Sequence, residues 1–396
     1  MNMNEQMKES EESILHTYNR FPVVFEKGQG CYLYDSEGKE YLDFAAGIAV
    51  NSLGYHYPGY DEALKNQIDK LMHISNLYYN EPIIEAGAKL VKASKMSKAF
   101  FTNSGTEAIE GALKAAKKYA YVRDGHADHE IIAMNHSFHG RSIGALSVTG
   151  TAHYREPFEP LMGGVKFADF NDLESVKAQI TDKTCAIITE VVQGEGGIYP
   201  AKKEFLEGLR QICDEKDIML IFDEIQCGMG RTGHYFAWQA YGVQPDIMTS
   251  AKALGCGVPV GAFVLGEKAA KASLEPGDHG TTYGGNPFVC AAVSKVFDIY
   301  ENDKIIEHVQ EMTPYLEQKL DEIVAKHECA ATRRGMGFMQ GIVIQGGPVG
   351  EVVKAALAKG LLVISAGSDV LRIVPPLVIT KEHIDKMAAI LDECME

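Results

Sequence analysis

The chain has 396 residues, a length that suits two or three domains with large hydrophobic cores. Lys and Arg number 38 against 54 Asp and Glu, which gives a formal net charge of −16 at pH 7. Because proteins that bind phosphate backbones present net-positive surfaces, this charge argues against nucleic acid as a partner.

The eight cysteines are scattered without a Cys-x-x-Cys pair, which is typical of free thiols in a reducing cytosol. The N-terminal stretch MNMNEQMKESEES is polar and lacks the apolar core of a signal peptide. No apolar run approaches the length that crosses a membrane. We therefore expect a cytoplasmic protein without a membrane partner.

The predicted elements begin with a helical arm over residues 1–20. Two aromatic-rich strands, at 30–34 and 40–44, flank a Gly-containing turn and predict a β-hairpin. A loop rich in Gly and Tyr follows at 47–60. This loop either lines a pocket or is a plain connection.

From about residue 60 the sequence alternates helix and strand patterns, which predicts an α/β fold around a mainly parallel sheet. Its strands are predicted at 99–102, 130–134, 185–190, 218–223, 247–250 and 260–265. A smaller α/β unit follows, with strands near 338–344, 361–364 and 370–374 and a last helix after Thr380. We predict an N-terminal segment (1–60) that packs with the small domain, a large domain (61–300) and a C-terminal small domain (301–396).

The residues Asn103-Ser104-Gly105-Thr106-Glu107 follow a short strand and open a helix whose apolar residues lie on one face. A helix N-terminus offers free N–H groups and a positive dipole end to an anion, and Gly105 lets the backbone come close. The pattern suits a phosphate site, although for so short a motif, taken alone, an ordinary Ser or Thr helix cap is the better explanation. It is neither a P-loop nor a dinucleotide motif.

The segment Ser137-Phe138-His139-Gly140-Arg141 joins an aromatic ring to a guanidinium. Phe138 can stack on a planar ring, and Arg141 can clamp a carboxylate with two parallel hydrogen bonds, although an Arg after Gly is usually on the surface. His136 and His139 suggest a metal pair, but no third ligand is visible, and we expect no metal site.

Two apolar runs, at 218–222 and 246–250, have the character of buried parallel strands, whose carboxyl ends bind ligands in open α/β sheets. Asp223 follows the first run and Lys252 the second. Alone, Asp223 is interpreted as a helix cap and Lys252 as solvated surface. Together they suit pyridoxal phosphate, because an amine forms a Schiff base with its carbonyl and a carboxylate keeps its pyridine nitrogen protonated.

The surroundings of these two residues resemble the fold-type I, class III aminotransferases. The resemblance rests on Asp223-Glu224-Ile225-Gln226, on Gly228, Gly230, Arg231, Thr232 and Gly233, and on Ser250-Ala251-Lys252-Ala253-Leu254-Gly255. It implies Lys252 as the Schiff-base lysine, Asp223 as the pyridinium partner and Gln226 near the 3-hydroxyl of the ring. It further implies that Ser104, Gly105 and Thr106 hold the cofactor phosphate, so that the large domain binds the cofactor.

The same resemblance implies a homodimer with shared active sites. In HGTTYGGNP, residues 279–287, Thr282 would reach the phosphate of the neighbouring subunit's cofactor, and Thr281 would lie beside that subunit's substrate. Phe138 would cover the cofactor ring. Arg141 would hold the α-carboxylate of an N-acylated or free ornithine.

An aminotransferase that takes a terminal amine must mask the arginine that it needs for 2-oxoglutarate. The segments 190–197 and 371–376 resemble the matching parts of the family, in which Glu195 pairs with Arg372 and releases it when glutamate or 2-oxoglutarate binds. Without the resemblance, this pair would be interpreted as an ordinary salt bridge between domains.

Within the class, GIAVNSLG, HISNLYYNEP, NSGTEAIE and SFHGRS together look most like the acetylornithine aminotransferases. The implied reaction moves the terminal amine of N2-acetylornithine to 2-oxoglutarate, giving N-acetylglutamate 5-semialdehyde and glutamate in arginine biosynthesis. Ornithine or 4-aminobutyrate aminotransferase, and a non-catalytic sensor that binds the cofactor, are the alternatives. The chain departs from the pattern at Tyr55 and Tyr57, where His is usual, at Val191, where Pro is common, and at Cys256, where Gly is common.

Overall fold

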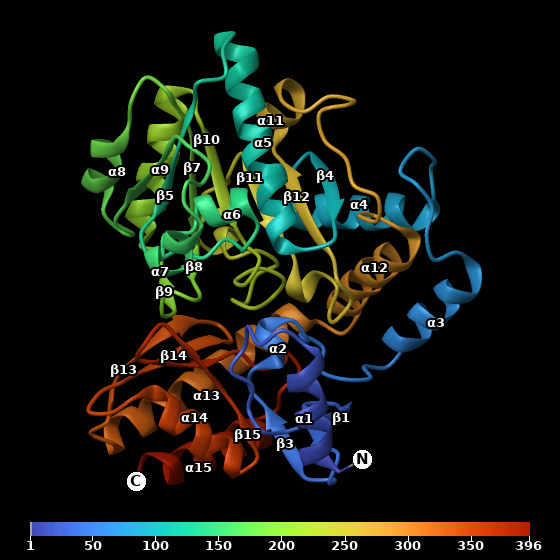
Figure 1. Cartoon of the computed structure of the whole chain (residues 1–396), viewed down its shortest axis with the longest axis vertical. Coiled ribbons are helices and arrows are strands. Elements are labelled where there is room, and N and C mark those ends of the chain that lie inside the picture. Colours follow the sequence, from blue (N-terminus) through green and yellow to red (C-terminus); the bar gives the residue numbers. More distant parts are fainter. Residues whose placement is uncertain (1) are drawn as a thin grey trace.

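The computed structural model describes residues 2–396 (Figure 1). Its elements form two parts. A large part surrounds a central sheet, and in a smaller part the N-terminal and C-terminal segments of the chain lie together, drawn in blue and red below the large part in Figure 1.

Seven strands form the central sheet, in the order β4-β12-β11-β10-β7-β5-β6. They are β4 (Lys98–Thr102), β5 (Glu130–Met134), β6 (Val165–Ala168), β7 (Thr184–Glu190), β10 (Met219–Asp223), β11 (Ile247–Ser250) and β12 (Gly261–Leu265). From β11 to β6 all neighbours are parallel, whereas β12 is antiparallel to both of its neighbours. The predicted α/β fold with a mainly parallel sheet is confirmed.

Helices cover both faces of this sheet, and for this reason its strands are continuous apolar runs. Along β10, Met219 and Ile221 belong to the core on the side of α5 (Gly105–Asp124), while Leu220 and Phe222 belong to the core on the side of α9 (Lys203–Lys216). The α5 side also has α6 (Ile143–Ser147) and α11 (Glu267–Ala272), and the α9 side has α4 (Glu81–Ser94), α8 (Leu173–Gln179) and α12 (Pro287–Asn302).

Shorter elements connect these layers. They are α3 (Tyr60–Lys70), α7 (Ala152–Arg155), η1 (Glu156–Phe158), α10 (Trp238–Tyr241), η2 (Lys252–Leu254) and a ribbon of β8 (Val192–Gln193) and β9 (Tyr199–Pro200). Because α/β connections of this kind lie at the ends of the strands, their loops are free to carry functional side chains.

Two four-stranded sheets organise the smaller part. One contains β1 (Phe25–Gln29), β2 (Tyr32–Asp35), β3 (Glu40–Asp43) and β15 (Leu361–Leu362), and the other contains β13 (Ala330–Met336), β14 (Met339–Ile344), β17 (Val370–Ile373) and β16 (Ile364–Ala366). The parallel pairing of Leu42 with Leu361 joins the N-terminal hairpin to the C-terminal segment. The helices here are α1 (Met3–Ser13), α2 (Ala46–Ala49), α13 (Ile305–Lys326), α14 (Val349–Ala358) and α15 (Lys381–Met395).

The structure corrects some of the predicted boundaries. The helical arm expected over residues 1–20 is helical only as α1, residues 14–20 are not helical, and residue 1 lies outside the described residues. The predicted hairpin is present as β2 and β3. The strands β1, β6, β8, β9 and β13 were not predicted, and the domain boundaries at residues 60 and 300 stay a prediction.

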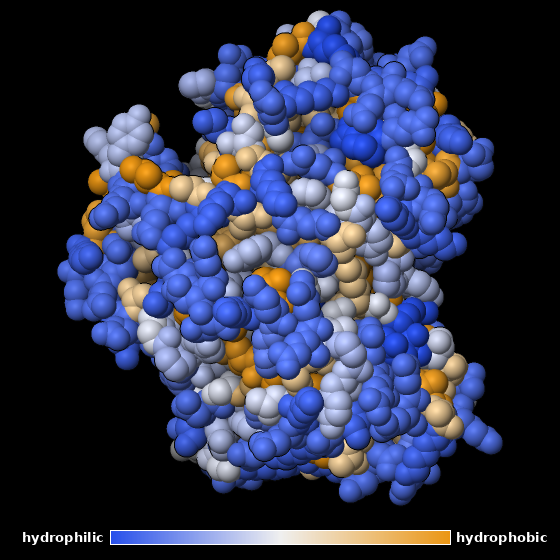
Figure 2. Space-filling view, turned by 180° about the vertical axis from the view of Figure 1, so that it is seen from behind, coloured by the Kyte–Doolittle hydropathy of each residue, from blue (hydrophilic) through white to orange (hydrophobic). Residues whose placement is uncertain are grey.

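The surface opposite to the view of Figure 1 is mainly hydrophilic, with apolar side chains gathered in separate patches (Figure 2). Within residues 2–396, no helix combines the length and the apolar character that a membrane crossing requires.

Candidate active site

A cavity of about 510 Å³ opens at the carboxyl ends of the central strands, where the loops after β4, β5, β10 and β11 come together. Eight of the predicted site residues line it: Ser104, Gly105, Thr106, Phe138, Arg141, Asp223, Gln226 and Lys252. Residues more than a hundred positions apart in the sequence thus share one wall.

The first turn of α5 forms one end of this cavity. Ser104 is the N-cap, and its Oγ accepts a hydrogen bond from the N–H of Glu107 at 3.3 Å. Gly105 and Thr106 are the next two residues, so their N–H groups have no partner within the helix and are available to an anion. A Cβ on Gly105 would lie only 2.9 Å from Cδ1 of Ile225. The cap interpretation is right for Ser104, and Ser104, Gly105 and Thr106 also face the cavity as lining residues.

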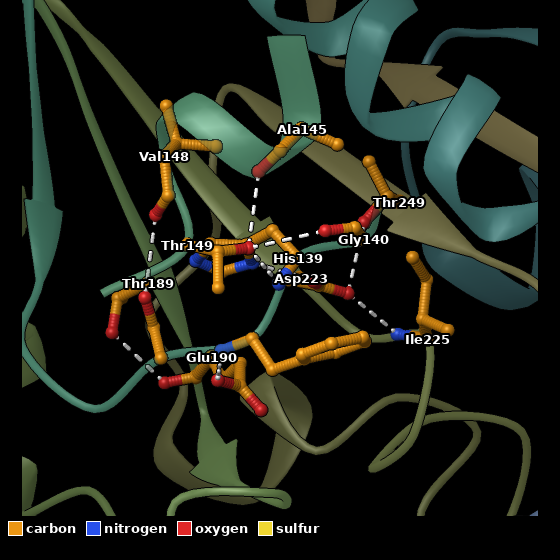
Figure 3. A network of polar contacts seen from close by, with 12 residues as sticks. His139, Gly140, Ala145, Val148, Thr149, Thr189, Glu190, Asp223, Ile225 and Thr249 are labelled. Carbon is orange, nitrogen blue, oxygen red and sulfur yellow. Dashed lines mark hydrogen bonds and ion pairs between the residues drawn. The ribbon is translucent and has the colours of Figure 1, made fainter. Parts of the chain in front are cut away.

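Asp223, the last residue of β10, is buried and fixed on both oxygens. Its Oδ1 accepts hydrogen bonds from the N–H of Ile225 at 3.0 Å and from Oγ1 of Thr249 at 3.2 Å, and its Oδ2 lies 2.7 Å from Nδ1 of His139. Figure 3 shows His139 and Asp223 at the centre of this network. A buried carboxylate held in this way favours a cationic partner in the cavity.

Lys252 follows β11 and begins η2 with a φ of 50°, a left-handed conformation that is uncommon for residues other than Gly and frequent at functional sites. Burial lowers the pKa of Lys252 to about 8, a shift that Glu195 opposes and Arg372 increases. The amine is consequently a stronger nucleophile near neutral pH than an exposed lysine.

Arg372, in β17, brings the smaller part of the molecule to the edge of the cavity. Its Nη1 lies 2.5 Å from Oε1 of Glu195 and 3.1 Å from Oε1 of Gln226, and its Nη2 lies 3.2 Å from Oε2 of Glu195. Burial alone would raise the pKa of Glu195, but Arg372, Lys252 and Gln226 together outweigh burial and leave that pKa below its ordinary value. Glu195 and Arg372 therefore form a charged pair joined by two hydrogen bonds.

Arg141 and Phe138, from the loop after β5, also line the cavity. The guanidinium of Arg141 is 4.1 Å from the ring centre of Tyr154 and 5.6 Å from that of Phe138. Arg141 is exposed and forms neither a side-chain hydrogen bond nor a salt bridge to the other described residues. It is free to bind a carboxylate.

Glu190, at the end of β7, was not predicted as a site residue although it lines the cavity. Its carboxylate accepts hydrogen bonds from the N–H of Phe138 at 3.1 Å and from the N–H of Gly194 at 2.9 Å. Burial raises the pKa of Glu190 to about 7, His139 opposes the shift, and Asp223 adds to it. Glu190 joins the loop that carries Phe138 to the loop that carries Glu195.

Thr281 and Thr282 belong to the loop between α11 and α12. Neither is among the described residues that line the cavity of their own chain. Oγ1 of Thr281 accepts hydrogen bonds from Nδ2 of Asn103 at 3.3 Å and from the N–H of Gly284 at 3.1 Å, and Thr282 is exposed. The surface position leaves Thr282 accessible to a second chain.

The two tyrosines that replace the usual histidines point elsewhere. The hydroxyl of Tyr55 donates to Oδ2 of Asp43 at 2.8 Å, and the hydroxyl of Tyr57 donates to Oδ2 of Asp303 at 2.9 Å. Among the described residues that line the cavity, neither tyrosine is found. These hydroxyls are therefore not placed to contact a substrate in this cavity.

Comparison with known proteins places this geometry in a family. The model of the class-III aminotransferase family matches residues 14–395. The chain is a class III aminotransferase. This class III aminotransferase is 47% identical over 388 residues to the acetylornithine aminotransferase of Clostridium acetobutylicum, covering 98% of this chain and 100% of the relative. It is 48% identical over 383 residues to the acetylornithine aminotransferase of Methanocaldococcus jannaschii, covering 96% and 95%.

Two further proteins, named for other substrates, are also similar to this chain. The succinylornithine transaminase of Yersinia pseudotuberculosis is 44% identical over 385 residues, covering 94% of this class III aminotransferase and 92% of the relative. The solved structure of the ornithine aminotransferase from Toxoplasma gondii, described with partial occupancy of PLP, has a TM-score of 0.95 at 28% identity, covering 100% and 94%. The fold-type I architecture follows from this likeness.

Class III aminotransferases depend on pyridoxal phosphate, and the residues of the cavity fit that group. The open turn of α5 suits the phosphate, and the fixed carboxylate of Asp223 suits a protonated ring nitrogen. The buried amine of Lys252 suits the cofactor carbonyl. These three features face one cavity of adequate size.

Sequence reasoning missed two residues of this class III aminotransferase, Glu190 and His139, although the sequence contains a signal for each. Glu190 ends a buried strand in the same way as Asp223, so the strand-end signal applies to it. His139 was weighed only as a metal ligand, and it contacts Asp223 instead. No local signal indicates Tyr154, because its contact with Arg141 depends on how α6 and α7 fold back after residue 141.

Proposed function

We propose that the chain transfers the terminal amino group of N2-acetylornithine to 2-oxoglutarate, giving N-acetylglutamate 5-semialdehyde and glutamate. The observation that carries this proposal is the contrast between two arginines. Arg141 lines the Lys252 cavity, whereas Arg372 lines a second groove and contacts the cavity residue Gln226. Arg141 is exposed and free, whereas Arg372 is buried and paired with Glu195. A free and a masked arginine suit a donor and an acceptor that present carboxylates at different places.

The bound cofactor supplies an electron sink for the carbon that carries the amino group. Lys252 Nζ, with its lowered pKa, is the base that takes the proton from that carbon and the acid that returns it. The carboxylate of Asp223 stabilises the positive charge of the ring nitrogen, and Phe138 with Gln226 orients the ring. Ser104, Gly105 and Thr106 hold the phosphate through the first turn of α5.

Arg141 would bind the α-carboxylate of the donor with two parallel hydrogen bonds. While the donor is bound, Glu195 neutralises Arg372. The α-carboxylate of 2-oxoglutarate or glutamate competes with Glu195 for the same guanidinium, so Glu195 must turn away when the acceptor binds. The pair therefore works as an exchangeable mask.

We also propose a homodimer in which Thr281 and Thr282 complete the neighbouring site. Exposed apolar side chains support a protein partner, since Leu77, Tyr79 and Tyr283 are 87%, 95% and 61% exposed. Light scattering should give twice the mass of one chain. Mixed dimers of Lys252→Ala and Thr282→Ala chains contain one site with neither change, so they should be more active than the mean of the two homodimers; equal activity would contradict shared sites.

A cytoplasmic location belongs to this proposal too. All eight cysteines of the described chain are unpaired, which suits a reducing compartment.

The absorption of the bound cofactor tests the donor directly. N2-acetylornithine, N2-succinylornithine, ornithine and 4-aminobutyrate are added separately to the holoenzyme. The visible band should fall fastest with N2-acetylornithine and return on addition of 2-oxoglutarate. A faster response to another donor would keep the class and overturn the substrate, and a band that no donor changes would support the sensor alternative.

A further inference from the structure

The turn α2 lies between β3 and the loop at 50–60 and has a left-handed backbone. Ala46, Gly47, Ile48 and Ala49 have φ values of 48°, 63°, 65° and 61°. For residues other than Gly this conformation costs about 1–2 kcal/mol each, so consecutive examples persist only where surrounding contacts enforce them. Contacts with the rest of the chain must therefore hold α2 in this conformation.

The buried carboxylate of Asp43 supplies such contacts at the start of the turn. Its Oδ1 accepts hydrogen bonds from the N–H groups of Ala45 at 2.9 Å and Ala46 at 2.8 Å. Its Oδ2 accepts the hydroxyl of Tyr55 at 2.8 Å, and that hydroxyl in turn accepts from Nδ2 of Asn51 at 3.2 Å. Asp43 and Tyr55 thus hold both ends of the turn.

Tyr55 is itself held by the N-terminal hairpin. Its N–H and C=O pair with the backbone of Gly30. A Cβ on Gly28 would lie 2.4 Å from Cγ of Tyr55, so the ring packs directly on the backbone of β1. The tyrosine is therefore a fixed donor rather than a mobile surface side chain.

The turn separates two cavities. Val50, just after it, lines the cofactor cavity together with Lys252. Ile48, within it, lines a groove of about 950 Å³ together with Arg372. The backbone beside Asp43 is also tied to the strand of Arg372, because the N–H of Val374 donates to the C=O of Phe44 at 2.9 Å. A shift of the turn would therefore reach both sides of the acceptor site.

We propose that Asp43 and Tyr55 are positioning residues that hold the left-handed turn as the wall between the cofactor cavity and the Arg372 groove, and thereby set the affinity for the oxo-acid acceptor. Neither residue contacts the reacting atoms. They act through Ile48 and Val50. The proposal rests on the proposed function in taking Arg372 as the arginine that binds the acceptor and 2-oxoglutarate as the probe.

Tyr55→Phe removes one hydroxyl and keeps the ring on Gly28. We expect the KM for 2-oxoglutarate to rise about tenfold, because small displacements of binding groups have large effects, while kcat stays within about twofold. Hydrogen exchange of the apoenzyme, followed on peptides that cover residues 44–52, should become faster. A role in stability alone would lower the melting temperature without changing KM.

Tyr57→Phe is the matched control. It removes a hydroxyl from the same loop, but this hydroxyl donates to Asp303 and not to Asp43. It should change neither KM nor the exchange of residues 44–52. If Tyr55→Phe does not fold, Asp43→Asn carries the same test, because one oxygen can still accept from Ala45 and Ala46. In the double variant the two effects should be less than additive.

Unchanged KM in folded Tyr55→Phe or Asp43→Asn, or unchanged exchange at 44–52, would overturn the proposal. KM is measured with whichever amine donor reacts fastest. If the wild-type enzyme does not react with N2-acetylornithine, the proposed donor is refuted. The comparison of KM for 2-oxoglutarate between variants and wild type still holds.

Discussion

Among single residues, Lys252 carries the largest share of the proposed chemistry. Lys252→Ala removes both the covalent anchor and the base. We expect the variant to bind pyridoxal phosphate only non-covalently, so that dialysis removes it, and turnover to fall by a thousandfold or more, since a positioned base contributes about 10²–10⁴-fold. Substantial turnover by this variant would contradict the role of Lys252.

The lowered pKa of Lys252 predicts how the rate of cofactor uptake depends on pH. Burial brings this pKa from 10.5 to about 8, and only the neutral amine attacks the cofactor carbonyl. The rate at which apoenzyme takes up pyridoxal phosphate should therefore rise with pH up to about 8 and level off above it. Stopped-flow absorbance over pH 6 to 10 measures this profile.

A rise that continued toward pH 10.5 would show an ordinary lysine and contradict the burial argument. The profile of Glu195→Gln provides a control. Since Glu195 raises the pKa of Lys252, its neutralisation should move the midpoint to lower pH.

Sequence reasoning found some of these residues and missed others for physical reasons. Asp223 ends a buried strand and Lys252 follows one closely, and this local pattern indicates the ligand edge of a sheet. Tyr55 was noticed only as a departure from a family pattern. Its role depends on Asp43 and Asn51, and the direction in which its hydroxyl points follows from packing against Gly28, which the sequence does not reveal.

At the level of elements, α5 combines a structural and a binding task in its first turn. Ser104→Ala should destabilise the apoenzyme by about 0.5–2 kcal/mol, as is usual for a lost N-cap, and should also weaken pyridoxal phosphate binding. Thermal unfolding of the apoenzyme and titration with the cofactor measure the two effects separately.

Thr380→Ala is the control for this prediction, because Thr380 caps α15 with His383 far from the phosphate turn. It should lower stability and leave cofactor affinity unchanged. Equal cofactor affinity in Ser104→Ala and wild type would mean that Ser104 is a cap only.

The elements found from the sequence were those with strong local patterns. The strands β5, β7, β10 and β11 are apolar runs, and their bounds lie within a residue of the prediction. Two of the missed strands lack such a run: β6 reads VKFA, and β13 contains Thr332, Arg333 and Arg334. Pairing with neighbours, rather than local preference, makes them strands.

Over the whole molecule, the Glu195–Arg372 pair links the large and small parts at the substrate cavity. Glu195→Gln removes the internal competitor for Arg372. We expect the KM for glutamate to fall about tenfold, equivalent to about 1.4 kcal/mol, and kcat/KM for the amine donor to fall. Steady-state kinetics in both directions provide the measurement.

Glu40→Gln is the matched control, because Glu40 pairs with Lys386 at 3.1 Å on the exposed surface of the small part. It should leave both constants unchanged. A Glu195→Gln enzyme with wild-type constants for glutamate would contradict the mask.

The architecture of the large part was predictable because alternating helices and strands indicate a parallel sheet. The composition of the small part was predictable only in outline. No local pattern predicts that Leu42 pairs with Leu361, because hydrophobic periodicity carries no information on pairing between distant segments.

That pairing has a consequence for biosynthesis. During translation the hairpin of β2 and β3 emerges early, but its edge is covered only when β15 has been made, some 300 residues later. The central sheet, formed by residues 98–265, is complete well before then. A nascent chain should therefore bury its central sheet first and keep the edge of β3 unpaired until β15 has been made, so this edge is open to a chaperone throughout that interval.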